Sequence, residues 1–371
     1  MHIILSGKFF IEELNFVSKA IGNRIALPVH SGVKIEVKNG KINFTAISDE
    51  LVNYSSFDYK DYDQDIIVNQ EGTIVVECEK LKRIIEGIKG QNIEIIKVES
   101  NLVKIKSQFI NYNINSFPQE DFPNITFIDD TSIQFNINNY ILEEIIRNVS
   151  FACSEEKNRN NLSGINLIQE NNKLTASATN RFRLASYKFD IISSNNFNII
   201  VPGNIIKKQI NFAKNNDDIK VNVDNRFIQL SINNRKTRIS LIDDTYPNTS
   251  KILNQIVNAN IKVDSNDILE TIERARVITL DDSNQMIFEI YGNLMKIKAH
   301  SKSSETYTET IECKSISEEK LEFGINGNNL KDAIKGFEKS ECNLELCELN
   351  CIIIKSEKKP DLVHQIALLR P

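Results

Sequence analysis

The stretch ILEEIIRNVSFA, residues 141–152, carries two adjacent apolar residues, Ile141 and Leu142, and a third, Ile145, one helical turn later. This spacing predicts an amphipathic helix with one buried stripe. The same spacing occurs in FIEELNFVSKA (10–20) and in ILETIERARVI (268–278), which begin 131 residues before it and 127 residues after it. Recurrence at such intervals indicates that the fold is built from three copies of one unit.

A strand–turn–strand pattern follows each of these three helices. The first, SGVKIEVKNGKINFTAIS, turns at Asn39-Gly40, which is a strong hairpin signal. The other two turn at Asn171-Asn172 and at Gly292-Asn293. A second helix and three further strand-like runs come next in each copy. These second helices are predicted at 79–89, 203–214 and 328–339, and the first helices at 8–22, 138–149 and 265–279.

The first two copies end alike, in EDFPN (Glu120–Asn124) and DTYPN (Asp244–Asn248), whose prolines are 124 residues apart. We therefore expect an α+β fold of three repeated two-helix/β-sheet domains, each of ordinary domain size. The predicted boundaries are 1–126, 127–254 and 255–371.

Composition indicates a folded protein that does not cross a membrane. Hydrophobic residues make up 41% and charged residues 26% of 371 residues, and no apolar run approaches the length of a membrane span. The apolar patch at the N-terminus is too short for a secretory signal, so we expect a cytoplasmic protein with reduced thiols. Cys342, Cys347 and Cys351 cluster without a CxxC motif, and a structural role is favoured over a metal site.

Positive charge is concentrated on the predicted helices. The whole chain carries −5, the six helices together +4, and the remainder therefore −9. One interpretation is that the helix faces are merely solvated. The other is that the helices face a polyanion, with Lys82, Lys207 and Lys208 among the contacting cations, while the acidic remainder faces away. Three repeats that bend in the same sense would form an arc, and a head-to-tail second copy would close a ring.

The sequence resembles the bacterial DNA polymerase III beta subunits, the DNA sliding clamps, over essentially its whole length. The segments that carry the resemblance are GNRIALP (22–28), NLSGINL (161–167), ATNRFRLA (178–185), EDFPN, DTYPN and the C-terminal LLRP (368–371). The resemblance implies a DNA clamp fold and a head-to-tail homodimer that forms a six-domain ring. It further implies a non-catalytic processivity factor without a cofactor or metal, which encircles double-stranded DNA of any sequence. The implied protein partners are the polymerase III alpha subunit, the clamp loader and other proteins with clamp-binding motifs.

The resemblance also implies three sets of site residues. The DNA-facing positions match Arg24 and the loop that contains Lys157 and Arg159. The dimer contact matches Tyr112 and Ile114 packing against Ile278 of the partner subunit. A pocket for partner peptides between the second and third domains matches nine residues: Leu162, Thr179, Arg183, Leu184, Pro247, Lys251, Ile252, Leu369 and Arg370.

The chain departs from the family pattern beside this pocket. Asn180-Arg181-Phe182 replaces the family's Asp-Gly-His, so we expect the tight glycine turn to be lost. Lys251 stands where Arg is common, and lysine cannot form the same bidentate contact. Apart from the resemblance, Leu162, Leu184 and Leu369 could be ordinary core residues and Arg183 part of a surface ion pair. Arg24 and the pair Lys207-Lys208 could likewise be solvated surface.

Enzymatic activity is disfavoured because no P-loop, GxGxxG, HExxH, GxSxG or EF-hand pattern appears in the sequence. The pairs Glu12-Glu13 and Glu143-Glu144 recur at matching helix positions, which indicates repeat structure rather than acid–base chemistry. Two alternatives stay open: an enzyme whose site lies between domains and uses carboxylates or Cys153, and a scaffold of the same repeats that does not bind DNA.

Overall fold

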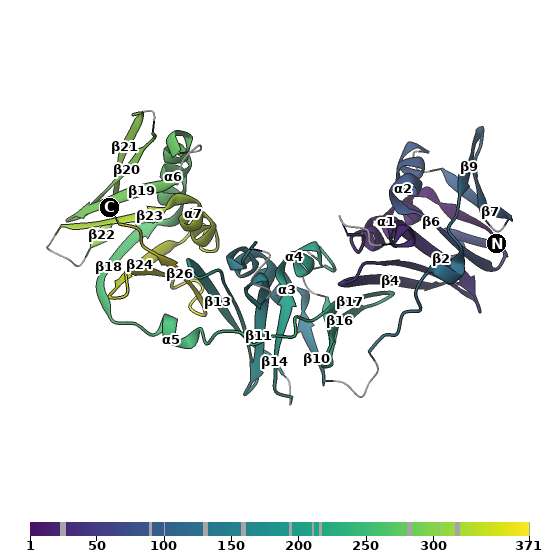
Figure 1. Ribbon diagram of the computed structural model, residues 1–371, viewed down its shortest axis with the longest axis horizontal. Coiled ribbons are helices and arrows are strands. Elements are labelled where there is room, and N and C mark those ends of the chain that lie inside the picture. The colour runs from purple at the N-terminus through teal and green to yellow at the C-terminus, as the bar shows by residue number, and fades with distance from the viewer. Residues whose placement is uncertain are drawn as a thin grey trace. The chain divides into compact units, whose positions relative to one another are not determined.

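A computed structural model describes residues 1–22, 27–88, 91–99, 101–128, 133–156, 161–192, 195–209, 211–214, 217–279, 284–302, 304–315 and 320–370. Its contacts divide the chain into two compact units (Figure 1). The first unit comprises Met1–Asn139 and Asn211–Leu241, and the second comprises Tyr140–Ile210 and Ile242–Pro371. Within the described ranges, no helix combines the length and apolar character that crossing a membrane requires.

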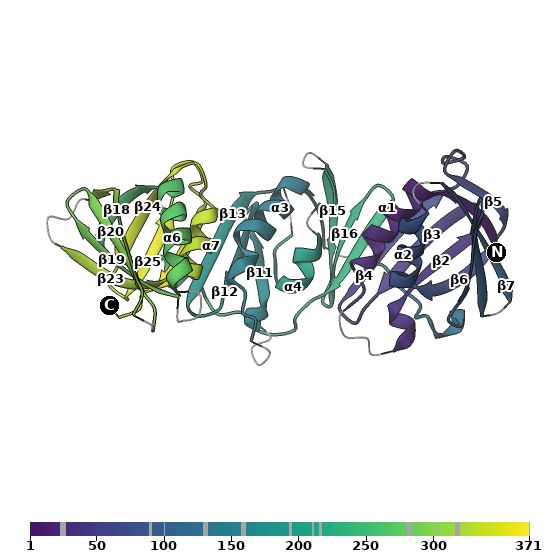
Figure 2. The ribbon, with the colours of Figure 1, turned by 90° about the horizontal axis from the view of Figure 1, so that it is seen from above.

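The helices form where the repeated apolar spacing predicts them. In α1, Phe10, Leu14 and Val17 are fully buried on one stripe, and the Ser6 Oγ accepts a hydrogen bond from the Phe9 backbone N–H at 3.3 Å. In Figure 2, α1 and α2 lie side by side on strands of the first unit, and α6 and α7 lie side by side in the second. The helices are α1 (Gly7–Ser18), α2 (Cys78–Gly87), α3 (Asn139–Asn148), α4 (Gly203–Ile206), α5 (Ser250–Leu253), α6 (Ser265–Thr279) and α7 (Gly327–Lys335).

The predicted helix 203–214 is wrong in length. Here α4 ends at Ile206 and continues only as the 3-10 turn η5 (Lys207–Gln209). Gln209 interrupts the apolar stripe, and Asn211 adopts a left-handed backbone with φ 59°, which does not continue a right-handed helix. Phe212 then packs into the first unit, where its ring lies 6.0 Å from that of Phe16.

The first unit contains a five-stranded sheet and an eight-stranded sheet, and all pairings given for their strands are antiparallel. The five-stranded order is β5 (Ile66–Gln70), β1 (His2–Ser6), β7 (Asn92–Glu99), β8 (Leu102–Ser107), β9 (Ile110–Asn115). The eight-stranded order is β10 (Ile133–Asn138), β15 (Asp218–Val223), β16 (Phe227–Ile232), β17 (Arg235–Ser240), β4 (Leu51–Asp58), β3 (Lys41–Ile47), β2 (Gly32–Lys38), β6 (Gly72–Glu77).

The second unit contains a nine-stranded sheet and a four-stranded sheet. The nine-stranded order is β14 (Phe197–Pro202), β11 (Gly164–Glu170), β12 (Lys173–Thr179), β13 (Arg183–Asp190), β26 (Leu362–Ala367), β25 (Cys351–Lys355), β24 (Glu341–Cys347), β18 (Val257–Asp264), β22 (Lys314–Ser315). The four-stranded order is β21 (Thr306–Glu312), β20 (Leu294–His300), β19 (Gln285–Tyr291), β23 (Leu321–Asn326).

The predicted hairpin turns are confirmed at the backbone. Asn39 and Gly40 both have positive φ (54° and 81°), as do Asn171 and Asn172 (51° and 60°), which is the geometry of a two-residue hairpin turn. Gly292 has φ 56° between β19 and β20. Asparagine and glycine are the residues that tolerate this region best.

Both long sheets are shared between predicted repeats. In the first unit β17, from the second repeat, pairs with β4 from the first. In the second unit β13, from the second repeat, pairs with β26 from the third. The predicted second domain therefore contributes strands to both compact units. The boundaries near 126 and 254 stay a prediction, because the units follow the shared sheets.

Buried polar groups reinforce each shared sheet. Beside the β4–β17 pairing, Asn53 donates through Nδ2 to the Phe16 carbonyl at 3.0 Å and accepts from the Thr237 hydroxyl at 2.8 Å. Beside β13–β26, the ring nitrogens of His364 lie 2.8 Å from the carbonyl oxygens of Asn148 and Ala333. Burial lowers the pKa of His364 to about 4, so the neutral ring donates to one of the two carbonyls.

Candidate functional site

The turn between β12 and β13 keeps a tight geometry although it lacks glycine. The Asn180 Oδ1 accepts hydrogen bonds from the backbone N–H groups of Phe182 and Arg183, both at 3.0 Å. Thr179 Oγ1 accepts from the Arg181 N–H at 3.1 Å, and Arg181 itself has φ 79°. The expected loss of the turn is therefore wrong: the side chains of Thr179 and Asn180 hold it, and Arg181 takes the left-handed position.

Arg183 already has a carboxylate partner within the chain. Its Nη1 donates to Asp332 Oδ2 at 2.9 Å and to Asn329 Oδ1 at 3.2 Å, both on α7. The guanidinium also lies over the Phe151 ring, 5.2 Å from its centroid. The ion pair named as an alternative for Arg183 is therefore present, with the Arg183 side chain 14% exposed and that of Asp332 38% exposed.

The second-repeat residues assigned to the peptide pocket lie around this turn. Leu162, Thr179 and Leu184 are buried, and Thr179 pairs with Leu184 across β12 and β13. The Thr179 N–H donates to the Tyr246 hydroxyl at 2.9 Å, next to the exposed Pro247. Burial raises the pKa of Tyr246, which keeps its hydroxyl neutral. These contacts bring Thr179, Leu184 and the Pro247 segment into one neighbourhood. Asn161, next to Leu162, donates through Nδ2 to the Thr245 carbonyl at 2.9 Å and so lies near the same segment.

The C-terminal tail connects that neighbourhood with the third repeat. The Ala367 N–H donates to the Phe182 carbonyl, Leu368 N–H to that of Asn350, and Leu369 N–H to that of Gly324, each at 2.8 Å. Gln285 Nε2 donates to the Arg370 carbonyl at 2.7 Å. Leu369 and Arg370 are exposed at the end of this tail. Hydrogen bonds thus hold the backbone of the tail, and its two assigned residues, Leu369 and Arg370, lie next to Gly324 and Gln285.

Lys251 and Ile252 lie on the short helix α5. Lys251 is exposed and Ile252 half-buried. Gln255 connects this helix to the body of the unit, because its Nε2 donates to the Ile252 carbonyl at 2.7 Å while its Oε1 accepts from the Cys351 thiol at 3.3 Å.

Sequence reasoning missed the exposed side chains of Ile256 and Leu349, whose segments are joined by a hydrogen bond from the Glu348 N–H to the Ile256 carbonyl. An apolar residue in a hairpin turn is the signal that could have pointed to Leu349.

A polar cleft of about 650 Å³ lies next to the turn between β12 and β13, within the second unit. Arg183 is the one assigned pocket residue that lines it. The other lining residues are Cys153, Ser154, Glu155, Glu156, Asn180, Phe182, Arg276, Asn326, Asn328, Asn329, Lys331 and Asp332. Burial raises the pKa of Cys153 to about 12, which keeps it a thiol and disfavours the alternative in which Cys153 acts as a nucleophile.

The recurring carboxylate pairs are engaged in ion pairs rather than facing each other across a reaction site. Glu12 and Glu13 both contact Arg235, at 2.9 and 2.6 Å. Glu143 pairs with Arg147 at 3.1 Å, and Glu144 with Lys359 at 2.9 Å. Within the described residues, no group of three or more His, Cys, Asp and Glu side chains is placed to hold a metal ion.

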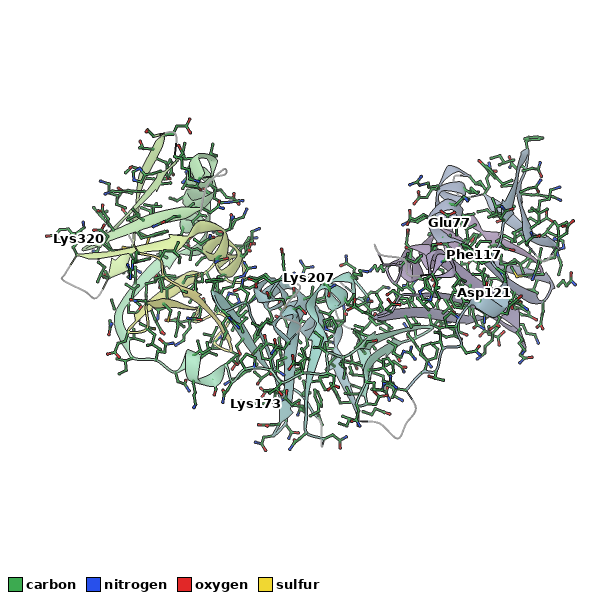
Figure 3. The ribbon with its side chains drawn as sticks, viewed as in Figure 1. Glu77, Phe117, Asp121, Lys173, Lys207 and Lys320 are labelled. Atoms are coloured by element: carbon green, nitrogen blue, oxygen red, sulfur yellow. The ribbon has the colours of Figure 1, made fainter. Side chains whose placement is uncertain are left out.

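The assigned DNA-facing residues are only partly described. Lys207 is exposed and Lys208 half-buried on η5, and Lys82 is half-buried on α2. Figure 3 shows Lys207 at the end of its unit where α3 and α4 lie, and Lys173 at the opposite end of the same strands. Arg24, Lys157 and Arg159 lie outside the described residues.

The assigned dimer residues differ in exposure. Tyr112 is 41% exposed and Ile114 is buried, both on β9 at one edge of the five-stranded sheet. Ile278 is half-buried on α6, next to the exposed Val277. Phe109, which sequence reasoning missed, is 98% exposed in the turn before β9.

These features define a protein of tandem α+β repeats that share sheets, the class to which DNA clamps belong. Models of the N-terminal, central and C-terminal domains of the DNA polymerase III beta subunit match residues 1–126, 136–248 and 251–370. The chain belongs to the DNA polymerase III beta subunit family.

Individual relatives agree with this assignment. Proteins named beta sliding clamp are similar to this chain: that of Halalkalibacterium halodurans is 25% identical over 90% of each chain, and that of Staphylococcus epidermidis is 24% identical over 99% of this chain and 98% of its own. The crystal structure of the DNA polymerase sliding clamp from Bacillus subtilis has a TM-score of 0.93 at 22% identity, covering 100% of this chain and 99% of its own. That of the DNA polymerase III beta chain from Streptococcus pneumoniae has a TM-score of 0.93 at 20% identity, covering 100% of both chains.

Proposed function

We propose that this protein is a DNA sliding clamp, a processivity factor without a catalytic site of its own. Two copies associate head to tail into a ring that encircles double-stranded DNA without sequence specificity. The observation that carries the proposal is the match of all three beta-subunit domain models, in order, along nearly the whole chain. The ring acts in the cytoplasm, where the clamp loader places it on DNA.

The charge distribution supports loose contact with DNA rather than tight binding. The chain is acidic overall, with a net charge of −5, while its predicted helices carry a small positive excess. A small excess neutralises few phosphates and releases few counterions, so the affinity stays low and sliding is permitted. Lys82, Lys207 and Lys208 are the proposed contacts, together with Arg24, Lys157 and Arg159.

The topology of DNA tests this function. Clamps loaded onto a nicked circular plasmid are expected to remain bound during gel filtration in salt that dissociates ordinary electrostatic complexes. Linearising the plasmid then releases them from the ends. Retention on linear DNA with free ends contradicts topological holding.

The assigned pocket is proposed to bind short peptide segments of the polymerase III alpha subunit, the clamp loader and other partners. The assigned set combines the half-buried Ile252 and the exposed Leu369 with the buried Leu162 and Leu184. A buried apolar anchor dominates affinity in peptide grooves. Deletion of residues 369–371 and the substitution Arg183→Ala are both expected to weaken binding of an alpha-subunit peptide in fluorescence anisotropy.

Arg274→Ala is the matched control, because Arg274 is an exposed arginine that pairs with Glu309 on another part of the second unit. Both variants and the control should remain dimeric in sedimentation. Unchanged peptide affinity in the deletion and in Arg183→Ala removes this assignment of the pocket.

A further inference from the structure

Two cysteines face each other at the end of one hairpin beside the proposed pocket. Cys347 ends β24, Cys351 begins β25, and the two residues are direct partners in the antiparallel pairing. Directly opposed residues project from the same face of a sheet, with Cα atoms about 4.5–5.5 Å apart. A disulfide joins Cα atoms about 4.4–6.8 Å apart, so this position accommodates one with little backbone movement.

The side chains of the two cysteines form one small apolar cluster. Cys347, Cys351 and Ile353 pack together with Val363, and both thiols are free. Cys347 is 6% exposed and Cys351 is 1% exposed. The hairpin turn between them, residues 348–350, is exposed.

Cys351 and the turn between the two cysteines are linked by hydrogen bonds to segments that carry residues assigned to the pocket. The Cys351 thiol donates to Gln255 Oε1 at 3.3 Å, and Gln255 in turn donates to the Ile252 carbonyl on α5. Asn350, in the turn between the cysteines, accepts the Leu368 N–H at 2.8 Å, immediately before Leu369. Cys351 also pairs with Ala367 across β25 and β26. A chemical change at the cysteine pair therefore alters groups that contact α5 and the C-terminal tail.

We propose that Cys347 and Cys351 form a reversible disulfide that weakens peptide binding in the proposed pocket. The thiolate of one cysteine attacks a low-molecular-weight disulfide, forms a mixed disulfide and releases one thiol. The second cysteine displaces the second thiol, so the protein loses two hydrogens and two electrons and the reagent is reduced to two thiols. The product lacks the S–H group that donates to Gln255 Oε1, and Gln255 is the side chain that donates to the Ile252 carbonyl of α5.

The environment also sets the rate of this reaction. Burial raises the pKa of Cys347 to about 11, so its thiol form predominates at neutral pH. Because the thiolate is the reacting species, oxidation through Cys347 is slow and accelerates about tenfold for each unit of pH.

The first experiment maps the disulfide in the full-length wild-type protein. The dimer is incubated with glutathione disulfide, free thiols are blocked, and the protein is digested and analysed by mass spectrometry. The expected product is a peptide linkage between Cys347 and Cys351 that dithiothreitol reverses. Persistent free thiols at both positions, or linkage of either cysteine to another residue, overturns the proposal without depending on any variant.

The second experiment measures the effect on the proposed function, on which this inference rests. Anisotropy with the alpha-subunit peptide is expected to show about fivefold weaker binding after oxidation, equivalent to the loss of one net hydrogen bond. Cys347→Ser and Cys351→Ser should bind equally before and after oxidant, whereas Cys313→Ser should respond as the wild type does.

The outcomes separate the two proposals. A mapped disulfide with unchanged affinity overturns the regulatory role and leaves the pocket standing. If the reduced wild type does not bind the peptide, the pocket assignment fails together with its regulation, and the mapping still decides whether the disulfide forms.

Discussion

At the scale of single residues, a left-handed backbone at Arg181 and a buried imidazole at His364 have the clearest consequences. Arg181 has φ 79° in the turn that Thr179 and Asn180 hold. A residue with a Cβ is strained in this region, whereas glycine is not. His364 is fully buried between carbonyl groups of α3 and α7.

Arg181→Gly is expected to stabilise the protein. Relief of backbone strain should exceed the added flexibility of the unfolded chain and raise the free energy of unfolding by roughly 0.5–1 kcal/mol. Urea unfolding measures the change, and Arg226→Gly provides a control at an exposed turn position without positive φ. A loss of stability in Arg181→Gly would contradict the strain argument.

His364 makes stability depend on pH. Burial lowers its pKa to about 4 from the ordinary value of 6.5, so the unfolded chain binds this proton more readily than the folded protein does. Its contribution is complete above pH 6.5 and is lost as pH falls toward 4, by roughly 3 kcal/mol in total. In His364→Gln, which can still donate a hydrogen bond but does not titrate, the fall in stability between pH 7 and 4.5 should be smaller than in the wild type. Urea unfolding at each pH measures the free energy of unfolding. An equal fall between pH 7 and 4.5 in both proteins would show that His364 does not carry the effect.

At the scale of elements, one arginine joins a strand of the second repeat to a helix of the first. Arg235 on β17 contacts Glu12 and Glu13 on α1 and lies over the Phe16 ring, 5.0 Å from its centroid. The Glu13 side chain is only 3% exposed. The arrangement secures α1 against the sheet shared by the two repeats.

Arg235→Ala should therefore cost much more than removal of a surface arginine. It leaves Glu13 buried without its partner, and the expected loss is about 3 kcal/mol of unfolding free energy. Arg274→Ala removes an arginine that is 49% exposed, where solvent screens the ion pair, and should cost much less. Chemical denaturation of both variants tests this difference. Comparable losses would mean that the buried carboxylate is satisfied by another group.

At the scale of the whole molecule, the proposed dimer depends on the edge strand β9. Tyr112→Arg places a charge on an edge residue that is 41% exposed. The expected result is a folded monomer near 42.4 kDa in sedimentation at micromolar concentration, where the wild type is twice that mass. Tyr291→Arg, at a tyrosine that is 72% exposed in the third repeat, should leave the dimer intact. A stable Tyr112→Arg dimer would exclude this position from the interface.

The proposed DNA contact is also a property of the assembled molecule. Lys207→Glu combined with Lys208→Glu should shorten the residence of loaded clamps on circular DNA and make retention more sensitive to salt, because phosphate contacts become repulsive. The dimer itself should persist. Lys173→Glu, at the opposite end of the same strands in Figure 3, is the matched control and should behave as the wild type does. Equal residence times in both variants would place Lys207 and Lys208 away from DNA.

Local features of the sequence predicted much of the fold. The turn at Asn39-Gly40 follows from residues that tolerate positive φ, and the helix α1 from an apolar stripe at helical spacing. The predicted helix 203–214 is too long because the repeat pattern extends it beyond two local signals. Gln209 interrupts the apolar stripe, and Asn211 ends the helix. The ion pair of Arg183 with Asp332 joins residues 149 apart, and local patterns do not specify such a partner.

The sequence by itself determined the threefold repeat, the hairpins, the helix positions and the family, because each depends on short-range periodicity or on the order of matching segments. The tertiary structure alone decided that the repeats share sheets, through β17 with β4 and β13 with β26. It also decided that His364 contacts a carbonyl 216 residues away. These pairings depend on which strand edges meet when the chain folds, and an unpaired edge offers the same N–H and C=O groups to any strand.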